Sequence, residues 1–429
     1  MSTSFDVVVV GAGPGGIAAA TVAAEAGRRV CILDDNAGPG GQIWRGYRPQ
    51  SARTYPYGSG FLDWTSRLAR AGCAVWSGWQ AVDCPAPGSL RLERNGESTD
   101  VRFDRLILAT GARERFLPFP GWTLPGVMGA GGLQALVKAG LNAKGKRVVV
   151  AGSGPLILAV AAGLHGAGAK IEGIYEQASL VRLATFGLTL FGQPGKLVEG
   201  AGYRLKTLRA RYRTRSWVVR VEGQGRVESV TVTDGRKKRT LACDWLACGF
   251  HLVPNLELPR LLGCRVAQGY VAVDAFQQSS VPDVACVGEL TGIGGLEKAL
   301  VEGQIAGWAA ADCESKARAL LPQRERLQRF AARLDRAFAP RAELRGLAAP
   351  ETVVCRCEDV AYAALKACAS WREAKLHTRC GMGACQGRVC GTATEFFFGW
   401  ENTGARPPVY PAMVSTLAAE VDVAEPVRQ

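Results

Sequence analysis

Apolar runs of five or six residues recur along the chain, and several of them lead into a glycine turn. Phe5–Val10 is such a run, fit for a strand buried on both faces. The alanine-rich stretch after it predicts a helix that reaches Ala26, and Arg29–Leu33 predicts a second strand. The same alternation returns in two later strands that run into glycines and in the helix after them: Leu106–Gly111, Val284–Gly295 and Leu296–Ala310. The pattern therefore predicts an α/β fold.

The first apolar run ends in GAGPGG, which places Gly11, Gly13 and Gly16 in the order GxGxxG. Gly11 allows a sharp turn, Gly13 lets the backbone approach a pyrophosphate, and Gly16 lets the helix pack on the strand. The N-terminus of that helix offers N–H groups and a partial positive charge to phosphates. Asp34 closes the second strand and can accept hydrogen bonds from a ribose. Together these features predict dinucleotide binding.

A second unit of the same kind begins at Arg147–Val150 and contains GSG, with Gly152 and Gly154 at the first two glycine positions. The third position holds Ile157, whose bulk is expected to separate helix from strand or to shift a ligand. Glu176 ends the next strand and could still hold a ribose. The residues leave two alternatives open: a working nicotinamide site, or a scaffold domain that has lost or changed its ligand.

Six of the fourteen cysteines lie between Cys355 and Cys390. In a long chain without a secretion signal, cysteines indicate free thiols, metal ligands or redox chemistry. Cys355 and Cys357 are two apart, so in an extended segment both sulfurs point the same way. Cys385 and Cys390 supply a second pair inside a glycine-rich loop. Four thiolates suit zinc or a 2Fe–2S cluster, and CxC with CxxxxC favours the cluster because zinc sites usually show CxxC pairs.

The other cysteines are interpreted as small buried hydrophobes. Three of them lie in apolar settings: Cys31, Cys248 and Cys286. Cys243 and Cys248 have CxxxxC spacing, but they flank a predicted strand and are expected to be structural. Cys368 is expected in the core, on a helix over Ala361–Ala369.

Composition and charge narrow the class of protein. The 429 residues are 48% hydrophobic and 21% charged, which indicates a globular protein of two or three domains. The net charge of +14 is not accompanied by a nucleic-acid-binding motif, so we expect no nucleic acid partner. No apolar run has the length and flanks of a transmembrane segment. No signal peptide precedes the first strand, and the protein is expected to be cytoplasmic.

The chain resembles flavoproteins with two dinucleotide-binding domains. The resemblance rests on the first glycine unit, on the strand that ends in ATG, and on the later stretch VACVGELTGIGG. The resemblance implies FAD at the first glycine motif and makes the second unit an NAD(P)-type domain, although Ile157 puts NAD(P) binding in doubt. It implies that Glu289, after Gly288, holds the ribityl chain. Further implied FAD contacts are Gly41, Gln42, Thr110 and Gly111. Many relatives reduce a redox disulfide, but the matching stretch PGGQIWR has no cysteine.

The segment from Glu351 to Trp400 resembles the bacterioferritin-associated ferredoxin type of 2Fe–2S domain. The ligands that this pattern implies are Cys355, Cys357, Cys385 and Cys390. Cys380, the first cysteine of CGMGACQGRVC, lies outside the pattern and is expected to be a neighbour rather than a ligand.

Nearly the whole chain resembles the α subunits of multi-subunit, dye-linked amine and amino-acid dehydrogenases, including those of D-hydroxyproline, opines and hydrogen cyanide synthesis. The most specific shared stretches are PGGQIWR, ATGARERFLPFPGWTLPGVMGAGG, GELTGIGGLEKALVEGQIAG and TRCGMGACQGRVC. The resemblance implies a partner flavoprotein, similar to D-amino-acid oxidases, that oxidises the CH–NH substrate, and a small ferredoxin-like subunit. The resemblance also implies FMN, bound at a subunit interface, as a further cofactor.

The expected layout has two Rossmann-like domains and a small cluster domain. Residues 1–115 and 245–320 form the FAD domain, 116–244 the NAD(P)-type insert, 321–350 a helical connector, 351–400 the 2Fe–2S domain and 401–429 a tail. The function expected first is an oxidoreductase subunit that relays electrons from its partner through FAD and the cluster. The alternatives are a self-sufficient NAD(P)H-dependent reductase and a non-enzymatic binding module.

Overall fold

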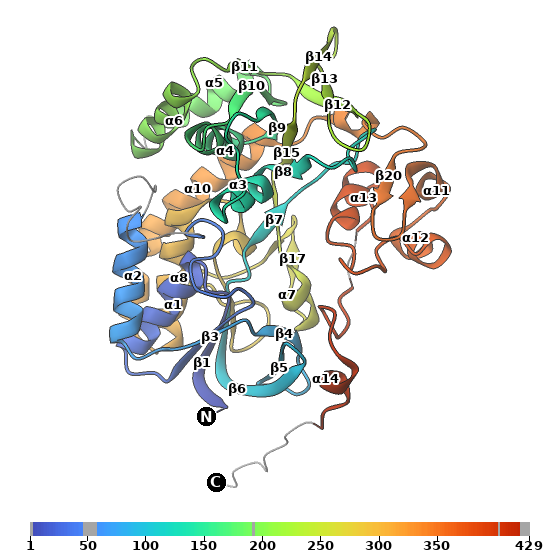
Figure 1. Cartoon of the computed structure of the whole chain (residues 1–429). Coiled ribbons are helices and arrows are strands. Elements are labelled where there is room, and N and C mark those ends of the chain that lie inside the picture. Colours follow the sequence, from blue (N-terminus) through green and yellow to red (C-terminus); the bar gives the residue numbers. More distant parts are fainter. Residues whose placement is uncertain (1–2, 46–57, 191–193, 402–403, 421–429) are drawn as a thin grey trace, which may run out of the picture. The chain divides into compact units, whose positions relative to one another are not determined.

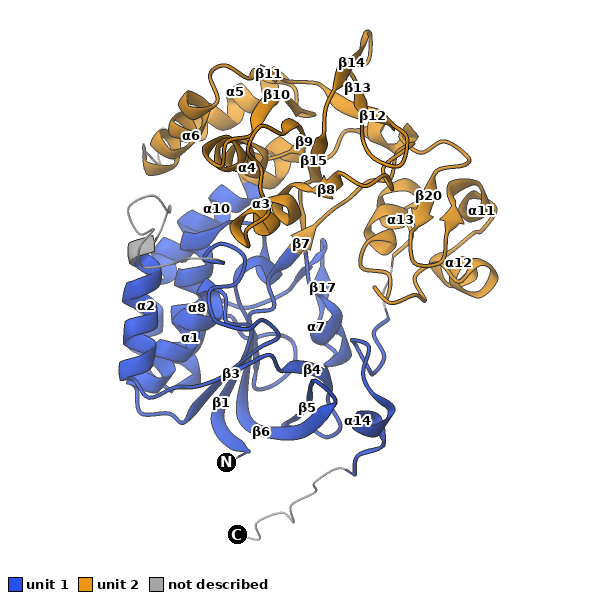
Figure 2. Cartoon of the chain, viewed as in Figure 1, with its two compact units in different colours: residues 1–112, 254–332, 403–429 blue, residues 113–253, 333–402 orange. Residues whose placement is uncertain are grey.

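The computed structural model of the chain describes residues 3–45, 58–190, 194–401 and 404–420 (Figure 1). Internal contacts divide the chain into two compact units (Figure 2). Unit 1 comprises Met1–Ala112, Pro254–Ala332 and Thr403–Gln429, and unit 2 comprises Arg113–Val253 and Arg333–Asn402. The chain crosses between them within β7 (Ala112–Glu114), β16 (Leu252–Pro254) and α10 (Leu321–Phe338).

Unit 1 is an α/β unit. Its strands are β1 (Ser4–Val10), β2 (Val30–Asp34), β3 (Ala74–Ser77), β4 (Gln80–Asp83), β5 (Ser89–Arg94), β6 (Glu97–Leu108), β17 (Val266–Ala267), β18 (Tyr270–Val271) and β19 (Val284–Cys286). Its helices are α1 (Pro14–Glu25), α2 (Gly58–Arg70), α7 (Glu257–Leu261), η3 (Gly288–Thr291), α8 (Leu296–Ala310), α9 (Glu314–Ala319) and α14 (Val414–Ala418).

The main sheet of unit 1 has the order β3-β2-β1-β6-β5-β4, with β19 beside β6. Strands β3, β2, β1, β6 and β19 are parallel, whereas β4, β5 and β6 form an antiparallel meander. Val7 and Val9 pack on the side of α1 and α8, and Val8 packs on the opposite side. Strand β1 is therefore buried on both faces, as its apolar run predicts.

Helices α1 and α8 pack closely against the same face because glycines remove the side chains between them. A Cβ on Gly303 would lie 2.1 Å from the carbonyl oxygen of Gly15, and one on Gly307 would lie 2.3 Å from that of Ala19. Figure 1 shows the two helices side by side with α2. This contact links the sequence-distant α8 to the first glycine turn.

Unit 2 contains a second parallel sheet and a small C-terminal subdomain. Its strands are β8 (Val127–Gly129), β9 (Arg147–Ser153), β10 (Lys170–Glu176), β11 (Arg211–Arg213), β12 (Trp217–Glu222), β13 (Ser229–Thr233), β14 (Lys238–Ala242), β15 (Trp245–Phe250), β20 (Val353–Cys355) and β21 (Val360–Ala361). Its helices are α3 (Ala130–Lys138), α4 (Pro155–Gly166), α5 (Leu180–Thr189), α6 (Pro194–Lys206), η4 (Ala342–Gly346), α11 (Tyr362–Lys366), α12 (Trp371–Thr378) and α13 (Cys390–Phe398).

The parallel sheet of unit 2 has the order β11-β10-β9-β15-β8. Strand β15 pairs with β9 on one side and β8 on the other, so it belongs to this sheet. The sequence prediction instead returned the chain to the FAD domain at residue 245. The return to unit 1 comes at Pro254, because β15 completes the second sheet first.

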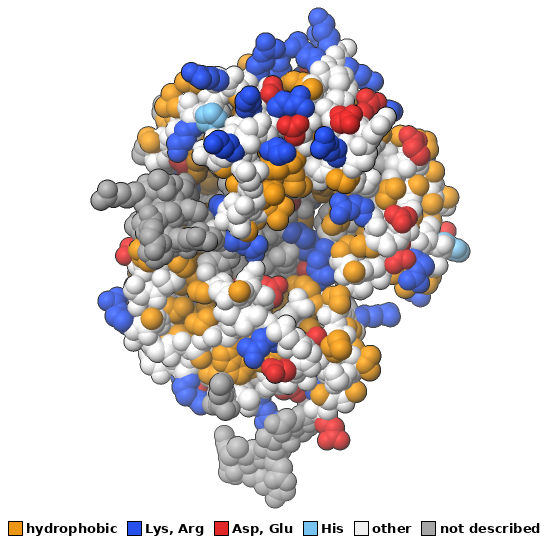
Figure 3. Space-filling model, in the orientation of Figure 1, with side chains coloured by type: hydrophobic (Ala, Val, Ile, Leu, Met, Phe, Trp, Pro, Cys, Tyr) orange, Lys and Arg blue, Asp and Glu red, His pale blue; other side chains and the backbone are white. Residues whose placement is uncertain are grey.

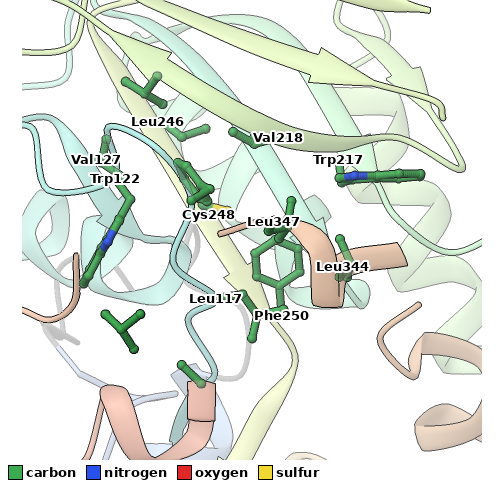
Figure 4. Packing of buried hydrophobic residues seen from close by; sticks show 14 of the residues in the cluster. Leu117, Trp122, Val127, Trp217, Val218, Leu246, Cys248, Phe250, Leu344 and Leu347 are labelled. Atoms are coloured by element: carbon green, nitrogen blue, oxygen red, sulfur yellow. The ribbon is translucent and has the colours of Figure 1, made fainter. Parts of the chain in front are cut away.

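The C-terminal subdomain of unit 2 shares a hydrophobic core with the second sheet. Figure 4 shows Leu344 and Leu347 of the η4 region beside Phe250 of β15 and below Val218 of β12. The same core continues to the cysteine-bearing segment. The indole Nε1 of Trp122 also donates to the carbonyl oxygen of Val353 at 2.6 Å. The cysteine subdomain is therefore fixed to the second sheet.

The C-terminal tail packs on the meander of unit 1. The buried Arg91 pairs with Asp100 and donates to the carbonyl oxygens of Thr416 and Ala419. The predicted extended arm thus contains one short helix, α14, held by backbone hydrogen bonds.

Basic side chains are conspicuous on the surface of unit 2. Figure 3 shows Lys and Arg side chains over the hairpin of β13 and β14, where Arg236, Lys237, Lys238 and Arg239 are all exposed.

Among the described residues, no helix is both long and apolar enough to cross a lipid bilayer.

Substituting Gly303→Ala should destabilise unit 1 by about 1–3 kcal/mol, because the added methyl group meets the backbone of α1. Gly60→Ala in α2 is the matched control, since its Cβ would meet no atom within 4 Å and alanine favours the helix. Urea unfolding of both variants checks this. Equal stabilities for both variants would contradict the close helix contact.

Candidate functional site

The first glycine turn lies where parallel strands of unit 1 end together. Gly11 has φ of +105°, and a Cβ there would lie 2.3 Å from the carbonyl oxygen of Ala109. A Cβ on Gly16 would lie 1.8 Å from the carbonyl oxygen of Gly11. Strand β6 and helix α1 thus both press on the turn, and only glycine fits at these two positions.

Asp34 holds the turn from the end of β2. Its carboxylate accepts from the backbone N–H of Ala12 at 2.5 Å and from that of Asn36 at 2.8 Å. The loop that carries Gly41 and Gln42 lies against the same turn, since a Cβ on Gly41 would lie 2.8 Å from the Cα of Gly13. The backbone of this loop therefore lies directly on the turn.

Thr110 and Gly111 follow β6 at the same edge of the sheet and are tied to Asn255. The Thr110 hydroxyl donates to the carbonyl oxygen of Asn255 at 3.0 Å, and the Asn255 amide donates back to the carbonyl oxygen of Thr110 at 2.8 Å. The backbone N–H of Asn255 donates to the carbonyl oxygen of Gly111.

Gly288 and Glu289 follow β19 and complete this edge. The Glu289 carboxylate accepts from the backbone N–H groups of Gly294 and Gly295 at 3.1 and 3.0 Å, at the start of α8. Burial raises the pKa of Glu289. In this structure the carboxylate is thus turned toward its own glycine loop.

A buried ion pair that the sequence analysis missed supports Gly288. The Lys298 ammonium bonds to the Glu302 carboxylate, to Thr291 and to the carbonyl oxygen of Gly288, all within 2.9 Å. Glu302 in turn accepts from the Gly288 N–H at 2.9 Å. In sequence this i,i+4 Lys–Glu pair looks like an ordinary surface pair of a helix, so no signal marked it.

The edge of the unit 1 sheet that carries the first glycine turn fits a bound dinucleotide. Among the described residues no side chain caps the N-terminus of α1, so its first N–H groups have no side-chain acceptor there. The buried indole Nε1 of Trp44, in the loop over the turn, also lacks a hydrogen-bond partner within the described part of the chain. A pyrophosphate with its ribose could meet such donors.

The second glycine turn is built differently. Strand β1 ends at Val10 before its glycines, whereas β9 continues through Gly152 to Ser153. Gly154 has φ of +101°, in contrast to −75° at Gly13. Ile157 is fully buried where the first turn has Gly16.

The chain itself occupies the polar groups around this second turn. Both oxygens of Glu176 are used, one by the N–H of Gly154 at 2.9 Å and one by that of Ala178 at 2.8 Å. The Glu176 side chain has no exposed surface. The acid expected to hold a ribose therefore binds its own backbone, as Asp34 does at the first turn.

The segment Phe338–Arg341, called the connector turn below, covers the same place. The Ser153 hydroxyl donates to the carbonyl oxygen of Phe338 at 2.7 Å. Gln177 donates to Ser153 and to the connector turn, and accepts from the N–H of Arg341 at 3.1 Å. Ser153 and Gln177 are 3% and 0% exposed. A nucleotide at this turn would have to displace these hydrogen bonds.

The cysteine segment forms a compact thiol cluster in unit 2. The Sγ atoms of Cys355, Cys380 and Cys390 all lie within 4.8 Å of one another, and all three residues are buried. Cys357 is exposed and Cys385 is half-buried. Two of the four predicted ligands thus lie next to Cys380 in the cluster core.

The thiols are electrostatically coupled. A hydrogen bond from the Cys390 thiol lowers the pKa of Cys355 to about 5 and that of Cys385 to about 4. Donating to these neighbours and to Cys380 raises the pKa of Cys390. Cys355 and Cys385 therefore favour the thiolate, the form that binds metals, whereas Cys390 keeps its proton.

Glycines and one tryptophan shape the loop around the thiols. Cβ atoms on Gly381 and Gly387 would lie 2.6 and 3.2 Å from the Trp371 ring, and one on Gly383 would lie 2.3 Å from the Cys357 Cβ. Trp371 is 8% exposed, and among the described residues its Nε1 has no acceptor. A thiol-lined, glycine-walled site with a spare N–H donor fits an iron–sulfur or zinc centre.

The model of the pyridine nucleotide-disulphide oxidoreductase family matches residues 5–312. The chain belongs to this family. The family implies FAD. The described chain has no disulfide, and the loop over the first turn carries no cysteine.

Two relatives match over most of their length. The opine oxidase A subunit of Rhizobium meliloti (strain 1021) is 34% identical, with 98% of this chain and 99% of the relative covered. Hydrogen cyanide synthase subunit HcnB of Pseudomonas aeruginosa is 33% identical, with 89% and 90% covered.

Solved structures support the fold. L-proline dehydrogenase from P. horikoshii aligns with a TM-score of 0.68 at 18% identity, covering 97% of this chain and 80% of that one. T. acidophilum thioredoxin reductase aligns with a TM-score of 0.56 at 20% identity, covering 72% and 99%.

Five of the eight scattered thiols of this oxidoreductase are buried, as predicted, namely Cys31, Cys243, Cys248, Cys264 and Cys286. The other three are half-buried: Cys73, Cys84 and Cys313. Burial raises the pKa of Cys31 and of Cys243 to about 12. Cys368 differs from its prediction, because α11 ends at Lys366 and Ser370 caps the next helix. Its thiol is half-buried and donates to the carbonyl oxygen of Ala364.

Glu176 makes the stability of unit 2 depend on pH. Burial raises its pKa from 4.5 to about 7, so the folded state holds a proton that the unfolded state releases above its own pKa. The free energy of unfolding should fall by on the order of 3 kcal/mol between pH 4.5 and 7 from this group. Urea unfolding across this range measures it.

Glu176→Gln should flatten this pH dependence, whereas Glu172→Gln, at an exposed site on the same strand, should preserve it. An unchanged slope in Glu176→Gln would show that the carboxyl is not buried in the folded protein.

Proposed function

We propose that the chain is the FAD- and 2Fe–2S-containing electron-transfer subunit of a multi-subunit dehydrogenase that oxidises an amine or amino acid. Substrate oxidation takes place on a partner flavoprotein, and this chain carries the electrons onward. One observation carries the proposal: the connector turn fills the second glycine turn through hydrogen bonds with Ser153 and Gln177. Without NAD(P)H at the second turn, the electrons must come from another donor.

The FAD site is assigned to residues at the carboxyl edge of the unit 1 sheet. They are Gly11, Gly13, Gly16, Asp34, Gly41, Gln42, Thr110, Gly111, Gly288 and Glu289. The glycine turn and the start of α1 would hold the pyrophosphate, and Asp34 would hold the ribose. The Glu302–Lys298 pair would keep the Gly288 backbone in place beneath the flavin end.

The metal centre is assigned to the thiol cluster, with Cys355, Cys357, Cys385 and Cys390 as its first ligands. When bound, FAD takes up two electrons and an iron–sulfur cluster passes single electrons. The chain's own part is to hold the thiolates, exclude water around the buried sulfurs and orient the loop through its glycines.

The names of the relatives support a CH–NH donor of the opine type, and a donor of the D-hydroxyproline type stays part of the proposal. Besides the opine oxidase A subunit, they include the alpha subunit of sarcosine oxidase from Corynebacterium, 28% identical over 71% of this chain. Opines and sarcosine each carry an amine nitrogen on an oxidisable carbon. Since both relatives are named as components of larger oxidases, a D-amino-acid-oxidase-like partner and a small ferredoxin-like subunit belong to the proposal. FMN bound at a subunit interface also belongs to the proposal.

The test is anaerobic reduction of the purified chain followed by absorbance. NADH and NADPH should leave the flavin and cluster bands unchanged for minutes, because the second turn is filled, and dithionite should bleach both. An amine substrate should bleach them only after the partner flavoprotein is added. Bleaching by NADH within seconds would instead establish the self-sufficient NAD(P)H-dependent reductase.

A further inference from the structure

We propose that the consecutive helices α5 and α6 of unit 2 form a docking surface for a different protein, whose own contact surface is apolar at its centre and acidic at its rim. The surface, called the docking face below, consists of six side chains: Leu180, Val181, Leu188, Val198, Leu205 and Leu208. Figure 1 shows the two helices at the end of unit 2 where β10 and β11 lie. None of these six residues is assigned to the FAD site or the metal centre, so the docking face goes beyond the proposed function.

The docking face concentrates exposed apolar surface in one short segment. Among the described residues, eight large hydrophobic side chains are more than 60% exposed, and six of them lie within residues 180–208. Single exposed hydrophobic side chains are ordinary on a protein surface, whereas a group of them marks an interaction site. The rest of the described surface has no comparable group, so a partner is expected at this segment.

Helix α5 is attached to the protein by one side and leaves the other side uncovered. Leu180, Ala184 and Leu188 are exposed at steps of four residues, which places them on one face of the helix. Phe186 is buried, and its ring packs edge-on against the ring of Phe338, with centroids 5.4 Å apart. The buried contact fixes the helix, and the exposed stripe is free to receive a partner.

Helix α6 exposes a stripe of the same kind. Val198, Ala201 and Leu205 are exposed at steps of three and four residues, and Leu208 continues the spacing into the turn after the helix. Thr207 is buried, and its hydroxyl donates to a backbone carbonyl of the helix. A 3-4-3 spacing of apolar residues is the pattern of a helix face that packs against another element.

Glycines in both helices leave room above the backbone. A Cβ on Gly187 in α5 or on Gly202 in α6 would meet no atom within 4 Å among the described residues, in contrast to one on Gly303 in α8. Glycine inside a helix is less favourable than alanine, and packing within the described chain does not require it at these two positions. A protein that packs closely on the helices would require it, whereas a lipid surface would not.

The charges beside the docking face are mostly basic. Arg182, Lys206 and Arg209 are exposed, and the one acidic residue within residues 180–208, Glu199, pairs with Lys196 at 3.7 Å. A second copy of this chain would bring the same basic side chains to the rim, and like charges there oppose association. Asp and Glu side chains around an apolar centre complement this rim, which points to a different protein.

Photocrosslinking in the cells that make the protein tests the docking face. Benzoylphenylalanine replaces Leu188 or Leu205 of the tagged full chain, and Leu376, which lies on α12 and is 71% exposed, is the matched control position. After irradiation, the chain is purified under denaturing conditions and its cross-linked peptides are identified by mass spectrometry.

Both docking-face positions should link to one and the same second protein, at an apolar segment flanked by Asp or Glu, and the Leu376 position should not link to that segment. Links only to another copy of this chain, links only to lipid, or no link at either position would each overturn the inference.

Binding of the identified partner to purified full-length variants gives the size of the effect. Leu188→Glu and Leu205→Glu should each weaken the complex by about tenfold or more, as expected for a buried contact residue, and Leu376→Glu should leave it unchanged. Arg209→Glu should weaken the complex and reduce its dependence on salt. Affinities equal to that of the unsubstituted chain in both docking-face variants would refute the docking face.

Gly202→Ala separates docking from folding. It should raise the unfolding midpoint of the free chain, because alanine favours the helix, and weaken the complex, because the added methyl group occupies the space left for the partner. A variant that is more stable and binds as tightly as the unsubstituted chain would contradict close packing on α6.

Discussion

Backbone N–H groups at the end of a buried parallel strand need an acceptor, and this constraint shapes both sheets of the protein. In unit 1 the acceptor at Ala12 is Asp34, and in unit 2 the acceptor at Gly154 is Glu176. Among the described residues, neither α1 nor α4 has a side-chain cap. The two turns differ because in unit 2 the connector turn uses the remaining polar groups of Ser153 and Gln177.

This difference gives the second sheet a structural role. Its core continues into the cysteine subdomain, and the connector turn that fills its glycine turn leads into the same subdomain. Hydrogen bonds that would serve a nicotinamide cofactor instead fix the segment that precedes the metal ligands. The filled second turn and the firm attachment of the thiol cluster thus have one cause, which is consistent with the proposed electron-relay subunit supplied by a partner.

Local patterns predicted much of the fold. The strand at Phe5–Val10, the helix at Leu296–Ala310 and the residues of the first turn follow from periodicity and glycine spacing. Ile157 correctly pointed to an altered second turn. No sequence pattern indicated that the connector turn would fill the second glycine turn, because Phe338 lies 185 residues after Ser153. The β15 boundary was misplaced because strand pairing is not local. Cys380 was interpreted as a neighbour of the ligands because it lies outside the CxC and CxxxxC pattern. Its position in the thiol cluster depends on the left-handed backbone at Arg379 and Gly381, which the pattern does not reveal.

Counting adenine-containing nucleotides released from the denatured chain tests the account most directly. The chain should be purified anaerobically, supplied with excess FAD, NAD and NADP, and freed of unbound nucleotide before denaturation. One dinucleotide per chain, identified as FAD, is the predicted result, because the connector turn fills the second glycine turn. Two dinucleotides per chain would show that the connector turn leaves the second site open and would contradict the central claim.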